Sequence, residues 1–322
     1  MRVGIIGCGI NGAYLGWKLA RKHEVTIFEK KSYIGKEVCS GLFSDRLWNF
    51  IPKNENLILN FINEIIIHFP KKDIVLKCSP KFNLMSHKLL DQYVSSLAEK
   101  DDVKVLLNSN VKKVFQVDNN KPQISVDKKV LEFDYLIGSD GFNSVVRKSL
   151  NIKDPKFYLG IYTYIDKKSD SNTAEVWPTR DGFAWLIPRG VNSEYGVVEK
   201  IDKAMFEFKN FCKSKRVPIK NIHSYVIPSG IVRVSKGRIA LTGDAAGINK
   251  PFSFGGVIWG LTADSILLKT FPNFQKYENN LLRFFEPKIY FSKLTEKLAR
   301  FIGFNIPTLL PSEIDFDSDW VF

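Results

Sequence analysis

The residues whose types and spacing could do chemistry begin close to the N-terminus. Gly7, Gly9 and Gly12 form a Gly-x-Gly-x-x-Gly run directly after the apolar residues 2–6. In this pattern Gly7 permits a tight turn, Gly9 lets the backbone approach a pyrophosphate, and Gly12 allows a helix to pack closely on a strand. A helix predicted over residues 13–22 would direct its free N–H groups at the anion. The run therefore predicts a phosphate cradle, the alternative being a glycine-rich turn without a ligand.

An acidic residue at the end of the next predicted strand extends this motif. Residues 24–28 are typical of a buried strand, and Glu29 follows them, about 20 residues after Gly7, where a carboxylate can hold the ribose hydroxyls of a bound adenosine. A glutamate at this place favours an unphosphorylated ribose. The cofactor expected from the cradle is therefore NAD or FAD rather than NADP, and the cradle alone leaves both open.

Two further segments resemble the motifs of a known superfamily. Residues 133–147 run from an apolar strand through Asp140-Gly141 into a helix start, and residues 238–251 contain Gly243-Asp244. These segments resemble the Asp-Gly and Gly-Asp motifs of the flavoprotein hydroxylase and geranylgeranyl reductase superfamily, whose members bind FAD in a fold similar to para-hydroxybenzoate hydroxylase. Asp244 can accept a hydrogen bond from a ribityl hydroxyl. The helix start at 255–257 offers backbone N–H groups to the flavin.

Within this superfamily the chain most resembles the geranylgeranyl reductases, including the archaeal digeranylgeranylglycerophospholipid reductases. Residues 35–41 (Gly-Lys-Glu-Val-Cys-Ser-Gly) are similar to the cysteine-containing loop of these enzymes. Residues 182–188 (Gly-Phe-Ala-Trp-Leu-Ile-Pro) are similar to their aromatic-x-Trp-x-aromatic-Pro motif. The chain is shorter than typical members, and this difference concerns the substrate pocket rather than the cofactor motifs.

The motifs and the resemblance together predict the site residues. Cys39 and Trp185 are the candidate catalytic residues, the alternatives being a small loop residue and a sheet-core tryptophan. At His87 the family usually carries an arginine. No metal ligands are expected. The predicted cofactor contacts are Gly7, Gly9, Asn11, Gly12, Glu29, Cys39, Ser40, Gly41, His87, Val111, Asp140, Gly243, Asp244, Pro251, Gly255, Gly256 and Val257.

The pattern of predicted elements gives an α/β (α+β) fold with a Rossmann-like FAD-binding domain. We expect that domain to be discontinuous, built from residues 1–55, 80–153 and 230–265. Residues 56–79 and 154–229 alternate as an antiparallel sheet does, with a helix over 202–215, and are expected to form the substrate domain. Residues 266–322 are expected to form a C-terminal helical region with aromatic and lysine-rich faces, either packed on the FAD-binding domain or lying on an anionic bilayer.

The composition limits the possible partners and compartments. The 322 residues include 47 Lys+Arg against 34 Asp+Glu, a net charge of +13, which favours an anionic partner. No RNA- or DNA-binding motif is present, so nucleic acid is not expected. The 4 cysteines form no Cys-x-x-Cys pair, and no apolar run approaches the roughly 18 residues of a membrane-spanning helix. A cytoplasmic protein, peripheral on the membrane face and monomeric, is expected.

The resemblance implies an FAD-dependent oxidoreductase that reduces isoprenoid C=C bonds of membrane lipids by hydride transfer from reduced FAD. The electron donor, NAD(P)H or a ferredoxin, stays open. The proton donor also stays open among Cys39, Tyr158, Tyr162, Tyr164 and bound water. The alternatives are a flavin-dependent monooxygenase or halogenase of the same fold, and a non-catalytic protein that binds FAD and lipid.

Overall fold

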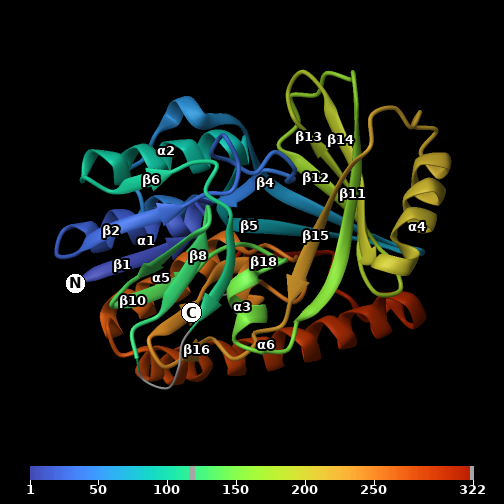
Figure 1. Ribbon diagram of the computed structural model, residues 1–322. Helices are drawn as coiled ribbons and strands as arrows, with labels where there is room; N and C mark the ends of the chain where they lie inside the picture. Colours follow the sequence, from blue (N-terminus) through green and yellow to red (C-terminus); the bar gives the residue numbers. More distant parts are fainter. Residues whose placement is uncertain (116–119, 320–322) are drawn as a thin grey trace. The chain divides into compact units, whose positions relative to one another are not determined.

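The computed structural model describes residues 1–115 and 120–319 (Figure 1). The chain divides into two compact units. The first unit comprises Met1–Glu37, His87–Lys156 and Pro228–Ile289, and the second comprises Val38–Ser86, Phe157–Ile227 and Tyr290–Phe322. Each unit is therefore built from three separate stretches of chain.

The first unit is organised around a six-stranded sheet with the order β16-β17-β10-β1-β2-β6. The pairs from β17 to β6 are parallel, and β16 is antiparallel to β17. Helices can cover both faces of such a sheet, which explains why its central strands are continuous apolar runs. The strands are β1 (Arg2–Ile6), β2 (Glu24–Phe28), β6 (Lys104–Leu106), β10 (Tyr135–Gly138), β16 (Ser235–Lys236) and β17 (Ile239–Leu241).

The first unit also contains helices, of which α1 comes after β1 and the glycine run. Helix α1 packs against both α2 and α5. A separate three-stranded sheet, not anticipated from the sequence, has the order β7-β8-β9. The elements are α1 (Ile10–Ala20), α2 (His87–Lys100), α3 (Val145–Ser149), η3 (Gly243–Ala246), α5 (Val257–Thr270), the start of α6 (Phe274–Asn305), β7 (Val111–Phe115), β8 (Gln123–Val126) and β9 (Lys129–Glu132).

The second unit contains a nine-stranded sheet with the order β15-β11-β14-β13-β12-β4-β5-β18, and β3 pairs with β5. Most pairs are antiparallel, as expected, but β12 is parallel to β4 and β18 is parallel to β5. The strands are β3 (Leu42–Ser44), β4 (Ile58–Phe69), β5 (Lys72–Met85), β11 (Lys156–Ile165), β12 (Thr173–Pro178), β13 (Phe183–Pro188), β14 (Ser193–Lys200), β15 (His223–Ser229) and β18 (Glu313–Asp317).

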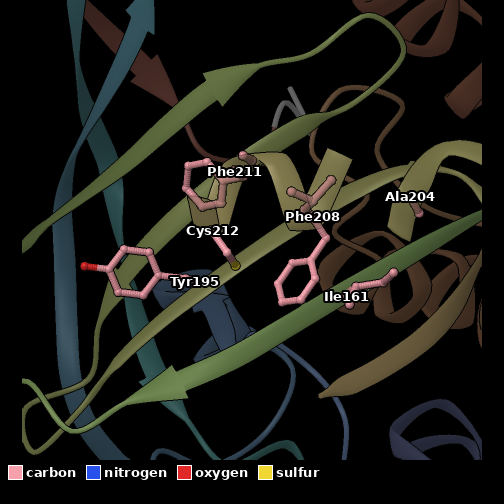
Figure 2. Packing of buried hydrophobic residues seen from close by; sticks show 8 residues of the cluster. Ile161, Tyr195, Ala204, Phe208, Phe211 and Cys212 are labelled. Atoms are coloured by element: carbon pink, nitrogen blue, oxygen red, sulfur yellow. The ribbon is translucent and has the colours of Figure 1, made fainter. Parts of the chain in front are cut away.

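The predicted helix over 202–215 is present as α4 (Ile201–Ser214), which packs against β11, β13 and β14. Figure 2 shows Phe208, Phe211 and Cys212 from α4 facing Ile161 and Tyr195 of the sheet. Phe208 is fully buried, and burial of a side chain of that size contributes about 2–3 kcal/mol to stability. This cluster anchors the helix to the part of the sheet that carries the aromatic motif.

The α/β fold class is confirmed, and the C-terminal region differs in one respect from the helical region that was expected. Helix α6 covers its first part, but the acidic stretch near the end forms strand β18 at the edge of the sheet. Ile314 and Phe316 alternate there with acidic residues, as a strand requires. Glu313 pairs with Lys77 at 2.5 Å, and Asp317 pairs with Arg46. Lys77 and Arg46 therefore compensate the charges of Glu313 and Asp317, whereas the sequence alone suggests that these acids are exposed to solvent.

Within the two described ranges, the apolar stretches of the helices fall short of what a bilayer crossing requires.

Candidate functional site

The glycine cradle in the first unit is fixed by close backbone contacts. Gly7 has φ +96°, and a Cβ there would lie 2.4 Å from the carbonyl oxygen of Ser139. A Cβ at Gly12 would lie 2.0 Å from the carbonyl oxygen of Gly7, whereas a Cβ at Gly9 would meet nothing within 4 Å. Gly9 is the N-cap of α1 and provides no side-chain cap. The first turn of α1 therefore presents backbone N–H groups on an open side, as binding of a pyrophosphate requires.

Glu29 is held at the edge of this cradle by backbone donors. The Cys8 N–H donates to Glu29 Oε2 at 2.9 Å, and the Lys31 N–H donates to Glu29 Oε1 at 3.0 Å. Each carboxylate oxygen has further acceptor capacity, so the pair of ribose hydroxyls of an adenosine finds acceptors here. A contact of Glu29 with a ribose stays a prediction.

The Gly-Asp loop lies directly beside the cradle. Gly243 has φ +56°, and a Cβ there would lie 2.5 Å from Oδ1 of Asn11. A Cβ at Gly256 would lie 3.7 Å from Oδ1 of Asp244. Gly256 is the N-cap of α5 and again provides no side-chain cap. The fold thus brings together four predicted contacts, Asn11 from the N-terminal part of the chain and Gly243, Asp244 and Gly256 from a part more than 230 residues later.

Lys36 adds a positive charge to this group that sequence reasoning did not predict. Its Nζ lies 3.3 Å from Oδ2 of Asp244, and its backbone N–H donates to Oδ2 of Asp91 at 2.9 Å. His87, the first residue of α2, lies with Nε2 3.4 Å from Oδ1 of Asp91. The side chain of His87 is therefore directed at its own helix, and a cofactor contact there stays a prediction.

Asp140 in the Asp-Gly motif caps helix α3. Its Oδ2 accepts from the N–H of Val145 at 2.6 Å and of Val146 at 3.2 Å, and burial raises the pKa of this carboxyl. Oδ1 is buried and has no hydrogen-bond partner among the described residues. The observed role of Asp140 is thus structural, and a direct contact with the cofactor stays a prediction.

Arg147 is fully buried and joins the two motifs. It donates from Nη1 to the carbonyl oxygen of Ala245 in the Gly-Asp loop at 2.8 Å, and from Nε to Asp154 at 2.8 Å. The sequence shows Arg147 as part of the motif, but its partner Ala245 lies too far along the chain to be predicted from spacing.

A buried acid, Asp264 of α5, contacts Asn11 in the cradle. It is fully buried and accepts from Asn11 Nδ2 at 2.7 Å and from the hydroxyl of Thr242. Burial raises its pKa to about 8. A Cβ at Gly260 would lie 2.6 Å from Asn11 Nδ2, so the Asn11 amide is enclosed between helix α5 and the Gly-Asp loop. Asn11 therefore positions the cradle, and its predicted contact with the cofactor is untested.

The remaining predicted contacts of the first unit lie around these elements. Val111 is a buried residue of β7, and Val257 is the first residue of α5. Pro251 lies in the turn between η3 and α5. Gly255 closes this turn, because its carbonyl oxygen accepts from the N–H of Lys250 at 3.1 Å.

The cysteine loop and the aromatic motif belong to the second unit, and an ion pair connects them. Arg189 Nη1 donates to the carbonyl oxygen of Ser40 at 2.6 Å and to Glu194 Oε2 at 2.8 Å. Trp185 Nε1 donates to Glu194 Oε1 at 2.9 Å. Glu194 is fully buried, and burial raises its pKa. Sequence reasoning missed Arg189 and Glu194, although Arg189 follows the aromatic motif directly.

The two candidate catalytic residues differ in exposure. Cys39 is half-buried, and its Sγ accepts from the N–H of Gly41 at 3.4 Å. Trp185 is buried, and a Cβ at Gly196 on the neighbouring strand would lie 2.2 Å from its indole ring. The indole therefore packs inside the sheet across Gly196. A catalytic role for either residue stays a prediction.

A cluster of aromatic rings lies in the same sheet. Tyr162 stacks on His223 with ring centroids 5.1 Å apart, and Tyr164 lies 5.3 Å from Tyr162. Burial raises the pKa of both phenols, so both stay protonated at neutral pH. They stay candidates for the proton donor.

No metal centre emerges from the ranges that the structure describes, since three or more His, Cys, Asp or Glu side chains are nowhere grouped as ligands there.

The parallel sheet, the uncapped helix start and the acid at the strand end define a Rossmann-type nucleotide-binding protein. Residues 5–41 match the family described as NAD(P)-binding Rossmann-like domain. A geranylgeranyl bacteriochlorophyll reductase-like protein from Thermoplasma acidophilum superimposes with a TM-score of 0.75 at 18% identity, over 92% of this chain and 83% of that one. The flavin-dependent halogenase CmlS superimposes with a TM-score of 0.72 at 15% identity, over 90% of this chain and 62% of that one. The chain has the fold of the FAD-dependent oxidoreductase superfamily.

Sequence comparison gives a curated relative that is named as a reductase. The chain is 24% identical to digeranylgeranylglycerophospholipid reductase 1 of Methanosphaera stadtmanae, over 97% of this chain and 83% of the relative. This relative confirms the resemblance to the geranylgeranyl reductases that the motifs predicted.

Proposed function

We propose that the protein is an FAD-dependent oxidoreductase that reduces isoprenoid C=C bonds, in geranylgeranyl chains of membrane lipids or their precursors. The carrying observation is the group in the first unit formed by the uncapped start of α1, Glu29, Asp244 and the uncapped start of α5. The similarity over nearly the whole chain to a reductase of this class supports the choice of reaction.

The residues of the first unit fit FAD in an order that follows the cofactor. The start of α1 at Gly9 would bind the pyrophosphate, and Glu29 would hold the adenosine ribose. Asp244 would accept from the ribityl chain, and the start of α5 at Gly256 would direct its N–H groups at the flavin. Bound FAD supplies hydride chemistry once it is reduced.

The second unit would supply the substrate side of the reaction. An isolated alkene is a poor electrophile, so orientation and exclusion of water must contribute much of the rate. Protonated Tyr162 and Tyr164 are the phenols that could deliver the proton, and Cys39 and Tyr158 are the other candidates. We assign the substrate as an isoprenoid lipid, with NAD(P)H or ferredoxin as the electron donor. We assign the place of action as the cytoplasmic face of the membrane, with the protein acting as a monomer.

The test is anaerobic incubation of the chemically reduced, FAD-loaded protein with geranylgeranylated phospholipid, followed by mass spectrometry. Products heavier by successive pairs of hydrogen atoms are expected. Protein with oxidised FAD is the matched control and should leave the lipid unchanged. Unchanged lipid with the reduced protein would contradict the proposal.

A second candidate function is a flavin-dependent monooxygenase or halogenase, favoured by the similarity in fold to CmlS. Such an enzyme requires oxygen, whereas the reductase works without it. Product formation that depends on oxygen would select this second candidate. Binding of FAD and lipid without any product would instead select a non-catalytic role.

A further inference from the structure

The last part of helix α6, residues 290–305, carries its apolar row on the exposed side. We call this part the distal α6 segment. Tyr290, Phe291, Leu294, Leu298 and Phe301 are 66%, 55%, 50%, 55% and 58% exposed. Their spacing of three and four residues places them on one face of the helix. An amphipathic helix of a globular protein normally turns such a face toward the core.

The opposite side of the distal α6 segment is polar, and it is this side that contacts the sheet of the second unit. Arg300 donates from Nη1 to the carbonyl oxygen of Thr179 at 2.6 Å and from Nη2 to that of Gly182 at 2.9 Å. Glu296 pairs with Arg300 at 2.9 Å. Ser292 is only 2% exposed. The polar side of the segment therefore makes the contacts with the sheet. The apolar row lies on the other side and is not the face that packs on the sheet.

A glycine fixes the same orientation near the end of the helix. A Cβ at Gly303 would lie 2.2 Å from the ring of Phe69 in β4, so the helix approaches the sheet as closely as its backbone allows. Beyond the helix the apolar row continues, because Ile306 is 45% and Leu309 is 68% exposed. The exposed row therefore extends past the helix into the 3₁₀ turn η4 (Pro307–Leu309).

The free charges within the distal α6 segment have one sign. Lys293 and Lys297 are exposed, whereas the one acid of the segment, Glu296, is engaged by Arg300. The whole chain carries +13. Lysines beside an apolar row that bears aromatic rings match an anionic bilayer surface, where apolar side chains enter the headgroup region and lysines meet lipid phosphates.

We propose that the distal α6 segment, together with Ile306 and Leu309, is the face by which the protein docks on an anionic lipid bilayer. The inference deepens the proposed function, since it names the surface that would bring the enzyme to a lipid substrate. It needs no turnover, so it can fail or hold independently of the reductase activity. A second copy of the chain could also cover an apolar row, but the lysines would then face each other across a two-fold axis and repel.

The experiment is cosedimentation of the full chain with phosphatidylcholine vesicles, with and without added phosphatidylglycerol. Binding is expected only to the anionic vesicles and should weaken with salt. The variant Leu294→Ser/Leu298→Ser/Phe301→Ser removes exposed side chains only, and should lower the ratio of bound to free protein by about tenfold or more. The variant Lys293→Glu/Lys297→Glu should have a similar effect, because it reverses the charge without touching the apolar row.

The matched control replaces exposed apolar residues of the other surface helix of the second unit. Ile201→Ser/Phe206→Ser on α4, where these side chains are 51% and 66% exposed, should leave vesicle binding unchanged. Equal binding by the distal α6 variants and the parent protein would overturn the proposal. The proposal would also be overturned if sedimentation showed that the parent protein is a dimer that does not bind vesicles, and that the distal α6 variants are monomers. Vesicle binding in a protein that yields no hydrogenated lipid would leave the docking face standing and overturn only the reductase.

Discussion

At the scale of single residues, two buried carboxyls are stabilised in different ways. Glu194 has a cationic partner, Arg189, and a second donor in Trp185. Asp264 accepts from the neutral groups of Asn11 and Thr242. Desolvation disfavours the charged form of Asp264, and these neutral donors offset it only in part, which is why burial raises its pKa to about 8.

Asp264 should make the stability of the protein depend on pH. Burial raises the pKa of this carboxyl to about 8 from its ordinary value of 3.8. Between these values the folded protein holds a proton that the unfolded chain has released, so the contribution of Asp264 to stability is full at low pH and is lost as pH rises. The free energy of unfolding of the parent, minus that of Asp264→Asn, should fall by about 1.4 kcal/mol per pH unit. Urea unfolding of both proteins between about pH 5 and pH 7 measures this difference. Parallel pH profiles would contradict it.

The Glu194–Arg189 pair should control the cysteine loop. Glu194→Gln leaves the guanidinium of Arg189, whose side chain is 11% exposed, without its counter-charge, which costs at most about 3–5 kcal/mol, and weakens the hold of Arg189 on Ser40. The thiol of Cys39 should then react faster with a maleimide under native conditions. Cys8, Cys78 and Cys212 are buried and should stay unlabelled.

Glu199→Gln is the control for that experiment. Glu199 is also a buried carboxyl of β14, but it accepts from Thr179 and from backbone N–H groups away from the cysteine loop. Labelling of Cys39 at the parent rate is expected in this variant. Equal acceleration in both variants would show that loss of stability, not the hold on the loop, exposes the thiol.

At the scale of elements, what could be predicted from sequence depended on how local the signal was. The cradle and Glu29 follow from spacing within one strand–helix–strand unit, and the structure places them as expected. Asp264 and Arg147 carry no such signal, because their partners Asn11 and Ala245 are distant in the chain. Strand β18 was missed because its acids look solvated until Arg46 and Lys77 are placed beside them.

The glycines of the cradle should separate folding from cofactor binding. A Cβ in Gly9→Ala meets open space in the protein, so the variant should fold with parent stability and bind FAD at least about tenfold more weakly, because the methyl group occupies the approach of the pyrophosphate. Gly12→Ala should instead destabilise the fold by about 1–3 kcal/mol, because its Cβ would overlap the Gly7 carbonyl oxygen. Flavin fluorescence titration and thermal unfolding measure the two effects. If Gly9→Ala bound FAD with the affinity of the parent protein, the assignment of the cradle to the cofactor site would be wrong.

At the scale of the whole molecule, cofactor binding should stabilise the two units unequally. A ligand that binds only the folded state adds about 2.7 kcal/mol at a hundredfold excess over its Kd. Hydrogen exchange with FAD present should slow in α1, in α5 and in residues 243–247, and should change little in α4. Slowing confined to the second unit would contradict the assignment of the first unit as the FAD-binding unit.

The fold class could be predicted because three motifs in order specify one sheet and its helices. The substrate is harder to predict, because its recognition depends on the packing of a mixed sheet. Trp185 illustrates this point: its motif left a catalytic residue and a sheet-core residue as alternatives, and only the structure shows the indole packed across Gly196 and bonded to Glu194. Such contacts across neighbouring strands leave no periodic trace in the sequence.

The interleaving of the two units also bears on how the chain is made. Strand β1 pairs on one edge with β2, which follows it closely in the chain, and on the other edge with β10, where Val3 lies opposite Tyr135. The strand beyond β10, β17, does not emerge until residues 239–241 are synthesised. During translation β10 therefore keeps an unpaired hydrogen-bonding edge while residues 157–227 of the second unit are being added. A chain truncated before residue 239 should therefore lack β17 and leave the edge of β10 open to pairing with other chains.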